Sequence, residues 1–201
     1  MFRSDLVLEN AAVSLRPMQL HHVGELSKIA TDDEIWTYFV LDLSGTGAMR
    51  SYVQSSIRLR DAGVRMPFVI CVDDEIVGST AFGAYSDRDQ RVEIGWSWVS
   101  LGVRGSPVNM NAKFLLMSYA FDQCGMERVE FKTDVLNARA RCALEKIGAV
   151  EEGVLRSHTA MHGLRRRDTV YYSVLRHEWP ARKADIFVDF SPLRQTVHSG
   201  G

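Results

Sequence analysis

Residues 96–109 read WSWVSLGVRGSPVN, a strand-like run that ends in a loop of small residues and leads into a long apolar helix. The free N–H groups of such a loop, together with the N-terminus of the helix after it, form a concave set of donors suited to phosphate. The loop lacks both the Gly-Lys-Ser/Thr end of a P-loop and the third glycine of a dinucleotide fingerprint. The sequence therefore favours a phosphorylated ligand and disfavours ATP and NAD.

The segments after the loop alternate between helix and strand. Asn109 is a residue type suited to a helix N-cap, and apolar residues at helical spacing follow it on two faces up to Gly125. Residues 128–135 alternate polar and apolar side chains as a strand does. Asn137 is expected to cap a short helix that ends at Gly148. The predicted order is strand, anion loop, helix, strand, helix.

The chain before this stretch predicts further strands and helices. The expected strands and helices, in chain order, are residues 13–17, 20–30, 48–61, 68–72 and 76–82, of which the second and third are helical. The acidic turn between the last two strands has the length of a hairpin loop, so these strands are expected to pair antiparallel.

Length, charge and cysteine usage restrict the class of protein. The 201 residues contain no internal repeat, so one domain is expected over residues 1–180, with a tail at 181–201 that is partly docked or disordered. A net charge of −1 gives no broad field for nucleic acid or an anionic membrane. No run approaches the ~18 apolar residues of a membrane span, and residues 1–10 lack a secretory signal. We expect a cytoplasmic monomer or homodimer, without metal because the three cysteines show no zinc-like spacing with histidine.

Several motifs between residues 13 and 179 together resemble a known family. They are VEIGW at 92–96 leading into RGS at 104–106, KTD at 132–134, NARAR at 137–141 running to KIGA at 146–149, and the closing pair EEGVLR at 151–156 and RDTVYYSVL at 167–175. This pattern is similar to the GNAT superfamily of acyl-CoA-dependent N-acyltransferases, in the branch that includes ribosomal-protein N-terminal acetyltransferases. The resemblance implies an α/β (α+β) fold whose mixed, largely antiparallel sheet has about six to seven strands and helices on both faces.

The resemblance also implies a cosubstrate and a set of site residues. Acetyl-CoA would place its pantetheine arm between the strand at 93–99 and the strand at 129–135, and an acceptor amine would attack the thioester directly. The residues that would hold the cosubstrate are Trp98, Val99, Arg104, Gly105, Ser106, Val108, Asn109, Asn137 and Arg141. Trp98 also fits the role of a core aromatic. Glu93 is the candidate base, and a solvent-facing strand glutamate is the alternative.

Two positions depart from the family pattern. Pro107 replaces a small residue of the phosphate loop and has no N–H to donate. Ala140 stands where this branch often carries a serine proposed to protonate the departing thiolate. These departures motivate an alternative function, a non-catalytic or weakly catalytic acyl-CoA-binding protein or sensor.

The acceptor is predicted only as a class of amines. A protein N-terminus, an amino acid, a polyamine and an amine-bearing antibiotic all fit, and Trp36, Tyr38, Phe39 and Leu41 are expected to line the acceptor side. Between the last two strands, His158, His162 and residues 165–167 form either a solvated basic turn or a surface that recognises an acidic acceptor.

Overall fold

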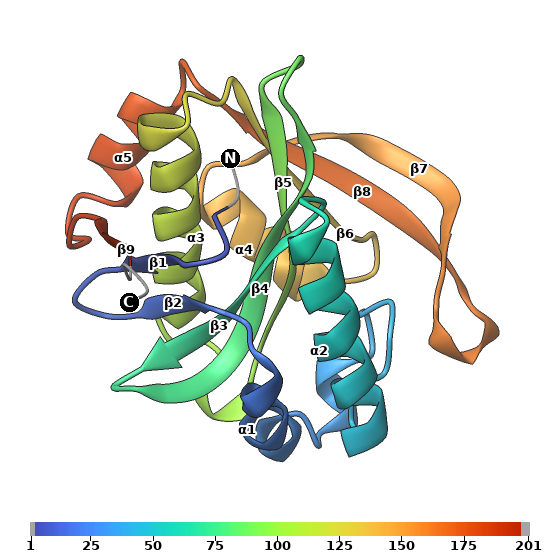
Figure 1. Cartoon of the computed structure of the whole chain (residues 1–201). Coiled ribbons are helices and arrows are strands. Elements are labelled where there is room, and N and C mark those ends of the chain that lie inside the picture. Colours follow the sequence, from blue (N-terminus) through green and yellow to red (C-terminus); the bar gives the residue numbers. More distant parts are fainter. Residues whose placement is uncertain (1–2, 198–201) are drawn as a thin grey trace.

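A sheet of nine strands runs through residues 3–197, the part of the chain that the computed structural model describes (Figure 1). In chain order the strands are β1 (Leu6–Glu9), β2 (Ser14–Pro17), β3 (Met66–Val72), β4 (Glu75–Ser86), β5 (Arg91–Val99), β6 (Arg128–Asp134), β7 (Val150–Ala160), β8 (Arg166–Leu175) and β9 (Arg194–Val197). Their spatial order is β7-β8-β6-β5-β4-β3-β2-β1-β9. Neighbours pair antiparallel except β5 and β6, which are parallel.

Helices cover both faces of this sheet. They are α1 (Val23–Ile29), α2 (Thr46–Asp61), α3 (Val108–Ser118), α4 (Ala138–Lys146) and α5 (Trp179–Ile186). One buried cluster joins the sheet to α1 and α2, and a larger one joins its other face to α3, α4 and α5 (Figure 1). Central strands such as β3 are apolar along almost their whole length because both of their faces are covered. The predicted mixed, largely antiparallel sheet with helices on both faces is confirmed.

The strand number was predicted too low, because two short strands at one edge escaped notice. β1 pairs with β2 on one side and with β9 on the other. Residues 181–197, expected as a tail, contribute α5 and β9 and pack on the rest of the chain. The rings of Phe187 and Phe190 lie 5.2 and 5.5 Å from that of Phe114 on α3. Residues 198–201, which include the end expected to be disordered, lie outside the described part.

Three helix starts differ from the prediction. The helix expected at residues 20–30 begins as a 3-10 turn, Leu20–His22, before α1, and α2 begins at Thr46 rather than at residue 48. Asn109 is not an N-cap, because α3 starts two residues earlier than this cap would place it, with Pro107 at the cap position. Proline suits a helix start, since its fixed φ is helical and its missing N–H would have had no partner there. Across residues 3–197, no helix combines the length and apolarity needed to cross a bilayer.

The strand β5 has two different halves. Residues 91–93 pair with β6 through the register Arg91 to Arg128 and Glu93 to Glu130, and beyond this point the two strands part. A bulge against β4 follows, where Trp96 has a φ of 51°. At the end of β5 the main chain of β4 comes very close, since a Cβ on Gly78 would lie 2.2 Å from the carbonyl oxygen of Trp98. The parting of β5 and β6 creates the space described next.

Candidate active site

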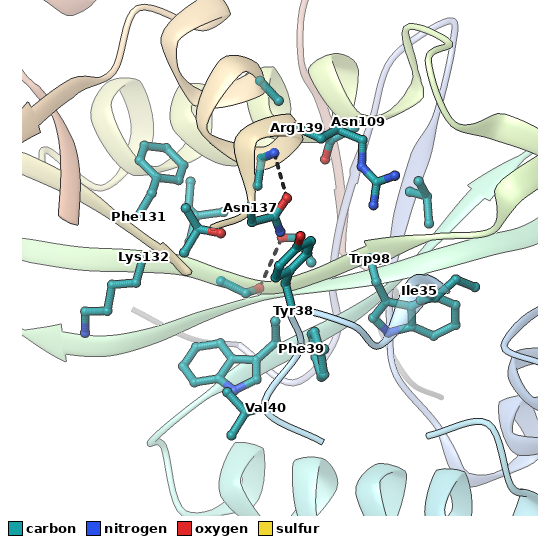
Figure 2. A pocket seen from close by; sticks show the side chains of 18 of the residues that line it. Ile35, Tyr38, Phe39, Val40, Trp98, Asn109, Phe131, Lys132, Asn137 and Arg139 are labelled. Atoms are coloured by element: carbon teal, nitrogen blue, oxygen red, sulfur yellow. Dashed lines mark hydrogen bonds between the residues drawn. The ribbon is translucent and has the colours of Figure 1, made fainter. Parts of the chain in front are cut away.

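A cavity of about 1020 Å³ opens where β5 and β6 separate. Both strands line it, together with α3, α4 and the 35–43 loop that precedes α2. In Figure 2, Asn109 and Arg139 lie toward one end of the cavity and Lys132 toward the other. Among the residues predicted from sequence, the structure brings Glu93, Trp98, Val99, Arg104, Gly105, Ser106, Asn109 and Asn137 to this cavity.

At the end of the cavity formed by the phosphate loop, residues 104–109, fewer main-chain N–H groups are free than the sequence indicated. Gly105 takes a φ of +79°, which glycine adopts without strain. The N–H of Ser106 donates to the carbonyl oxygen of Val103 at 3.3 Å, and the N–H of Val108 donates to the hydroxyl of Ser106 at 3.4 Å. Val108 is also not among the lining residues of the cavity. The N–H groups of Gly105 and Asn109 are therefore the predicted donors best placed for an anion, the latter at the orphan first turn of α3.

Two arginines converge beside this loop on one carboxylate. Arg104 and Arg139 approach the same oxygen of Glu34 at 3.3 and 3.5 Å. Burial, followed by the repulsion from Arg139, lowers the pKa of Arg104. A paired guanidinium set of this kind matches phosphate geometry. The carboxylate of Glu34 thus lies between the two guanidinium groups, in a position suited to an anion.

The short helix α4 places one predicted residue in the cavity and another outside it. The Oδ1 atom of Asn137 accepts the N–H of Ala140 at 3.0 Å, which confirms the predicted cap (Figure 2). Arg141 does not line the cavity, because its guanidinium donates to the hydroxyl of Tyr172 at 3.1 Å and to Glu151 at 3.0 Å. Arg139 faces the cavity instead.

The unpaired half of β5 forms one wall of the cavity. Residues 94–99 have no strand partner on the β6 side, so their main-chain groups on that side can bind an extended, amide-bearing ligand by strand-like pairing. Trp98 is 6% exposed and packs edge-on against Trp36 at 5.0 Å, which is the core role that the sequence left open. Its indole nitrogen has no hydrogen-bond partner among the described residues.

The opposite end of the cavity is rich in cations around one carboxylate. Glu93 is 8% exposed and its Oε2 atom lies 2.8 Å from Nζ of Lys132. Burial opposes the charge of Lys132, but the hydrogen bond and charge of Glu93 outweigh it and raise the pKa of the lysine. Arg167 of β8 and Arg65 line the same cavity, and no ion pair to either is found within residues 3–197. Burial lowers the pKa of both arginines.

The 35–43 loop lines the cavity, and the turn between β7 and β8 contacts this loop. Tyr38, Phe39 and Leu41 line the cavity as expected, whereas Trp36 is buried in the core. His162 fixes the loop, because its ring nitrogen lies 2.9 Å from the carbonyl oxygen of Trp36. The basic turn is therefore only partly solvated.

Lys113 is a lining residue that the sequence did not single out. Lys113 lies on the buried face of α3 and is 7% exposed. Its Nζ atom donates to the hydroxyl of Ser97 at 2.8 Å. Burial lowers its pKa to about 7. Its only sequence signal is a charge inside an otherwise apolar helical stripe.

The donor set fits coenzyme A better than a metal or a nucleotide of the P-loop type. Two arginines and the loop N–H groups suit a diphosphate, and the free strand edge suits the amides of pantetheine. Residues 3–197 hold no group of three His, Cys, Asp or Glu side chains arranged for a metal ion.

Known proteins share this fold and sequence pattern. The family model described as "Acetyltransferase (GNAT) domain" matches residues 13–150. "Putative ribosomal N-acetyltransferase YdaF" of Bacillus subtilis (strain 168) is 27% identical over 149 residues, 74% of this chain and 80% of that protein. The crystal structure of a "putative acetyltransferase" from T. thermophilus is 31% identical with a TM-score of 0.85, covering 94% of this chain and 99% of that one.

A further structure shares the fold alone. Mycobacterium smegmatis RimJ in complex with CoA-disulfide has a TM-score of 0.77 at 23% identity, covering 90% of this chain and 94% of that one. The family match spans more than half of the chain and includes β5, the phosphate loop and α4. The chain therefore belongs to the GNAT acetyltransferase family and is an acyltransferase.

Proposed function

We propose that this protein transfers an acetyl group from acetyl-CoA to a primary amine that binds at the Glu93 end of the cavity. The observation that carries the proposal is the parting of β5 and β6, which leaves a strand edge inside a cavity that begins at an anion-binding loop. When bound, acetyl-CoA supplies the acetyl group as a thioester. Arg104, Arg139 and the N–H groups of Gly105 and Asn109 would hold its phosphates, and residues 94–99 its amides.

Glu93 is the candidate base, acting directly or through a water. Lys132 holds one carboxylate oxygen at 2.8 Å, and the other oxygen lies toward Gly95, where a Cβ would be 3.0 Å from it. Both Glu93 and Gly95 line the cavity. An α-amino acceptor has a reference pKa of about 8 and needs less help from a base than a lysine amine at about 10.4. Both a protein N-terminus and an amino acid therefore fit a carboxylate held in an ion pair.

The cations around Glu93 favour an acceptor with a carboxylate near its amine. Three cations that line the cavity here, Arg65, Lys132 and Arg167, outnumber its two lining carboxylates, Glu93 and Asp42, and Arg65 stacks 3.7 Å from the ring centre of Trp96. A polycation such as a polyamine would be repelled there. Turnover of peptides of equal length that begin with acidic or with basic residues measures this preference. Arg167→Met should remove the preference for the acidic peptides.

Calorimetric titration of acetyl-CoA and of CoA into the protein tests the proposal first. The matched variant is Arg104→Glu, which should weaken binding about 100-fold, since an attraction near 1.5–3 kcal/mol becomes a repulsion. Turnover on the amine panel, followed through released thiol, then separates an enzyme from a non-catalytic acyl-CoA-binding protein. Equal binding by the two proteins would contradict the site, and binding without turnover of any amine would favour the alternative.

A further inference from the structure

Within residues 3–197, the buried amine of Lys113 forms no ion pair that would explain its presence. It donates to a neutral group, the hydroxyl of Ser97, which in turn lies 2.8 Å from the hydroxyl of Thr80, and it lies 5.5 Å from the ring centre of Phe131. A buried lysine is normally paired with a carboxylate, because an unpaired charge is costly to remove from water. Glu93 attracts Lys113 from a distance but is itself bound to Lys132. An apolar side chain at this position of α3 would pack without the free-energy cost of removing a charge from water.

The place of Lys113 along the cavity matters for the reaction. The phosphate loop lies at one end and the Glu93–Lys132 ion pair at the other. Ser97 lies between them on the unpaired half of β5, and Lys113 reaches it from α3. The thioester must lie between its phosphates and the acceptor amine, which is the same middle section. Ala140, the position at which a proton donor was expected, offers none.

We propose that Lys113 is the group that receives the departing sulfur, pairing with the CoA thiolate and protonating it. This inference rests on the proposed acetyl transfer. In that reaction the acceptor nitrogen forms a C–N bond to the acetyl carbon and the C–S bond breaks. The acceptor loses a proton to Glu93 or water, and the sulfur gains one from Nζ of Lys113, so protons balance. Lys113 is suited to this exchange because its amine titrates near neutral pH.

The charged groups around the amine set the sign of the expected effect. Burial disfavours the ammonium form of Lys113, while Glu93 favours it, and Glu93 is itself paired with Lys132 and attracted by Arg65 and Arg167. A thiolate bound beside Nζ would be a nearer anion than Glu93. The thiol of bound CoA should therefore ionise at a lower pH than the thiol of free CoA.

Ultraviolet absorbance of the thiolate in CoA-saturated protein, titrated with pH, measures this directly and needs no acceptor. In the wild type the ionisation of bound CoA should move by about one pH unit or more relative to free CoA, and Lys113→Met should abolish the shift. The wild type should bind CoA about tenfold more tightly than desulfo-CoA, and Lys113→Met should bind the two equally. Acetyl-CoA affinity should stay within about twofold, since the thioester carries no charge.

Two further variants keep the test clear of folding artefacts. Lys113→Arg retains the cation but cannot give up its proton, so it should keep the thiolate shift while slowing turnover. Lys146→Met removes an exposed lysine that lines the same cavity from α4, and it should behave as the wild type in the thiolate titration. Circular dichroism confirms that each variant is folded.

The outcomes separate the inference from the proposed function. An unshifted thiol in wild-type protein that binds acetyl-CoA, or a shift that survives in Lys113→Met, overturns the role of Lys113 and leaves acetyl transfer standing. Failure of the wild type to bind either acetyl-CoA or CoA overturns the proposed function, and the inference falls with it.

Discussion

The two halves of β5 belong to one continuous strand, yet they have different roles. Residues 91–93 are hydrogen-bonded to β4 on one side and to β6 on the other, and they hold the sheet together. Residues 94–99 keep only β4, and their other edge borders the cavity. A binding edge thus needs no special residues. It arises when a neighbouring strand turns away and leaves main-chain groups without partners.

The largest effect should follow from pushing β4 away from the unpaired half. In Gly78→Val, the new Cβ would meet the carbonyl oxygen of Trp98 at 2.2 Å and the Cα atom of Val99 at 2.9 Å, both of them backbone atoms that cannot rotate aside. We expect a loss of at least about 4 kcal/mol in the free energy of unfolding, or failure to fold. Urea denaturation measures it. Gly102→Ala is the control, because nothing lies within 4 Å of its Cβ. Similar midpoints for the two variants would show that the unpaired half tolerates displacement.

Within the paired half, residues 91–93, only Glu93 should take part in the reaction. Glu93→Gln should lower turnover by about 100-fold or more without weakening acetyl-CoA binding, because the amide cannot accept a proton. Glu130→Gln is a matched control: this carboxylate is equally buried, pairs with Arg128 at 2.9 Å, and stands opposite Glu93 in the register. It should affect stability rather than turnover. Equal loss of turnover in both variants would mean that the sheet, and not a base at residue 93, had been disturbed.

The charge of Lys113, which contacts the unpaired half of β5 through Ser97, should lower the free energy of unfolding in a pH-dependent way. The Lys113 amine attached to Ser97 titrates near 7 when folded, against 10.5 for the unfolded chain. Between these values the unfolded state binds more protons, so the free energy of unfolding rises with pH across this window. In Lys113→Met, the free energy of unfolding should not show this rise, and its excess over the wild type should be largest below about pH 7. Denaturation of both proteins across the window checks it, and parallel curves would place the amine in water.

The smallest effect should come from the carboxylate between Arg104 and Arg139. Glu34→Gln removes a competitor for the two guanidiniums and should tighten acetyl-CoA binding by about two- to fivefold, the size of an exposed ion pair. Calorimetry at low and high salt measures it, with Glu145→Gln on the exposed side of α4 as the control. Weaker binding in Glu34→Gln would show that the carboxylate orders the arginines rather than blocking them.

Local features of the fold and site could be predicted from sequence. The cap at Asn137 and the order of elements depend on neighbouring residues, and these expectations agree with the structure. The predicted start of α3 was wrong by two residues because proline at a helix start outweighed the capping tendency of Asn109.

Long-range features could not be predicted from sequence. Arg139 and Arg141 differ by two residues, about 200° around α4, so the choice between them depends on which side of the helix faces the cavity. Arg139 meets Glu34 across 105 residues of chain. Lys113 lies in a stripe that predicts burial, and only the packing of α3 under the parted strands shows that its amine borders the cavity.

The pairing of β1 with β9 imposes an order on assembly during translation. Residues 6–9 are made first, yet their outer partners at 194–197 follow some 185 residues later. At roughly 5–20 residues per second, this edge of the sheet waits about 10 to 40 s on the ribosome before it can be covered. The aromatic residues that brace α3 from behind, Phe187 and Phe190, arrive just as late. The helix behind the phosphate loop thus gains this support only after both residues have been made, so a nascent chain is expected to reach full cosubstrate affinity only once residues 187–190 have left the ribosome.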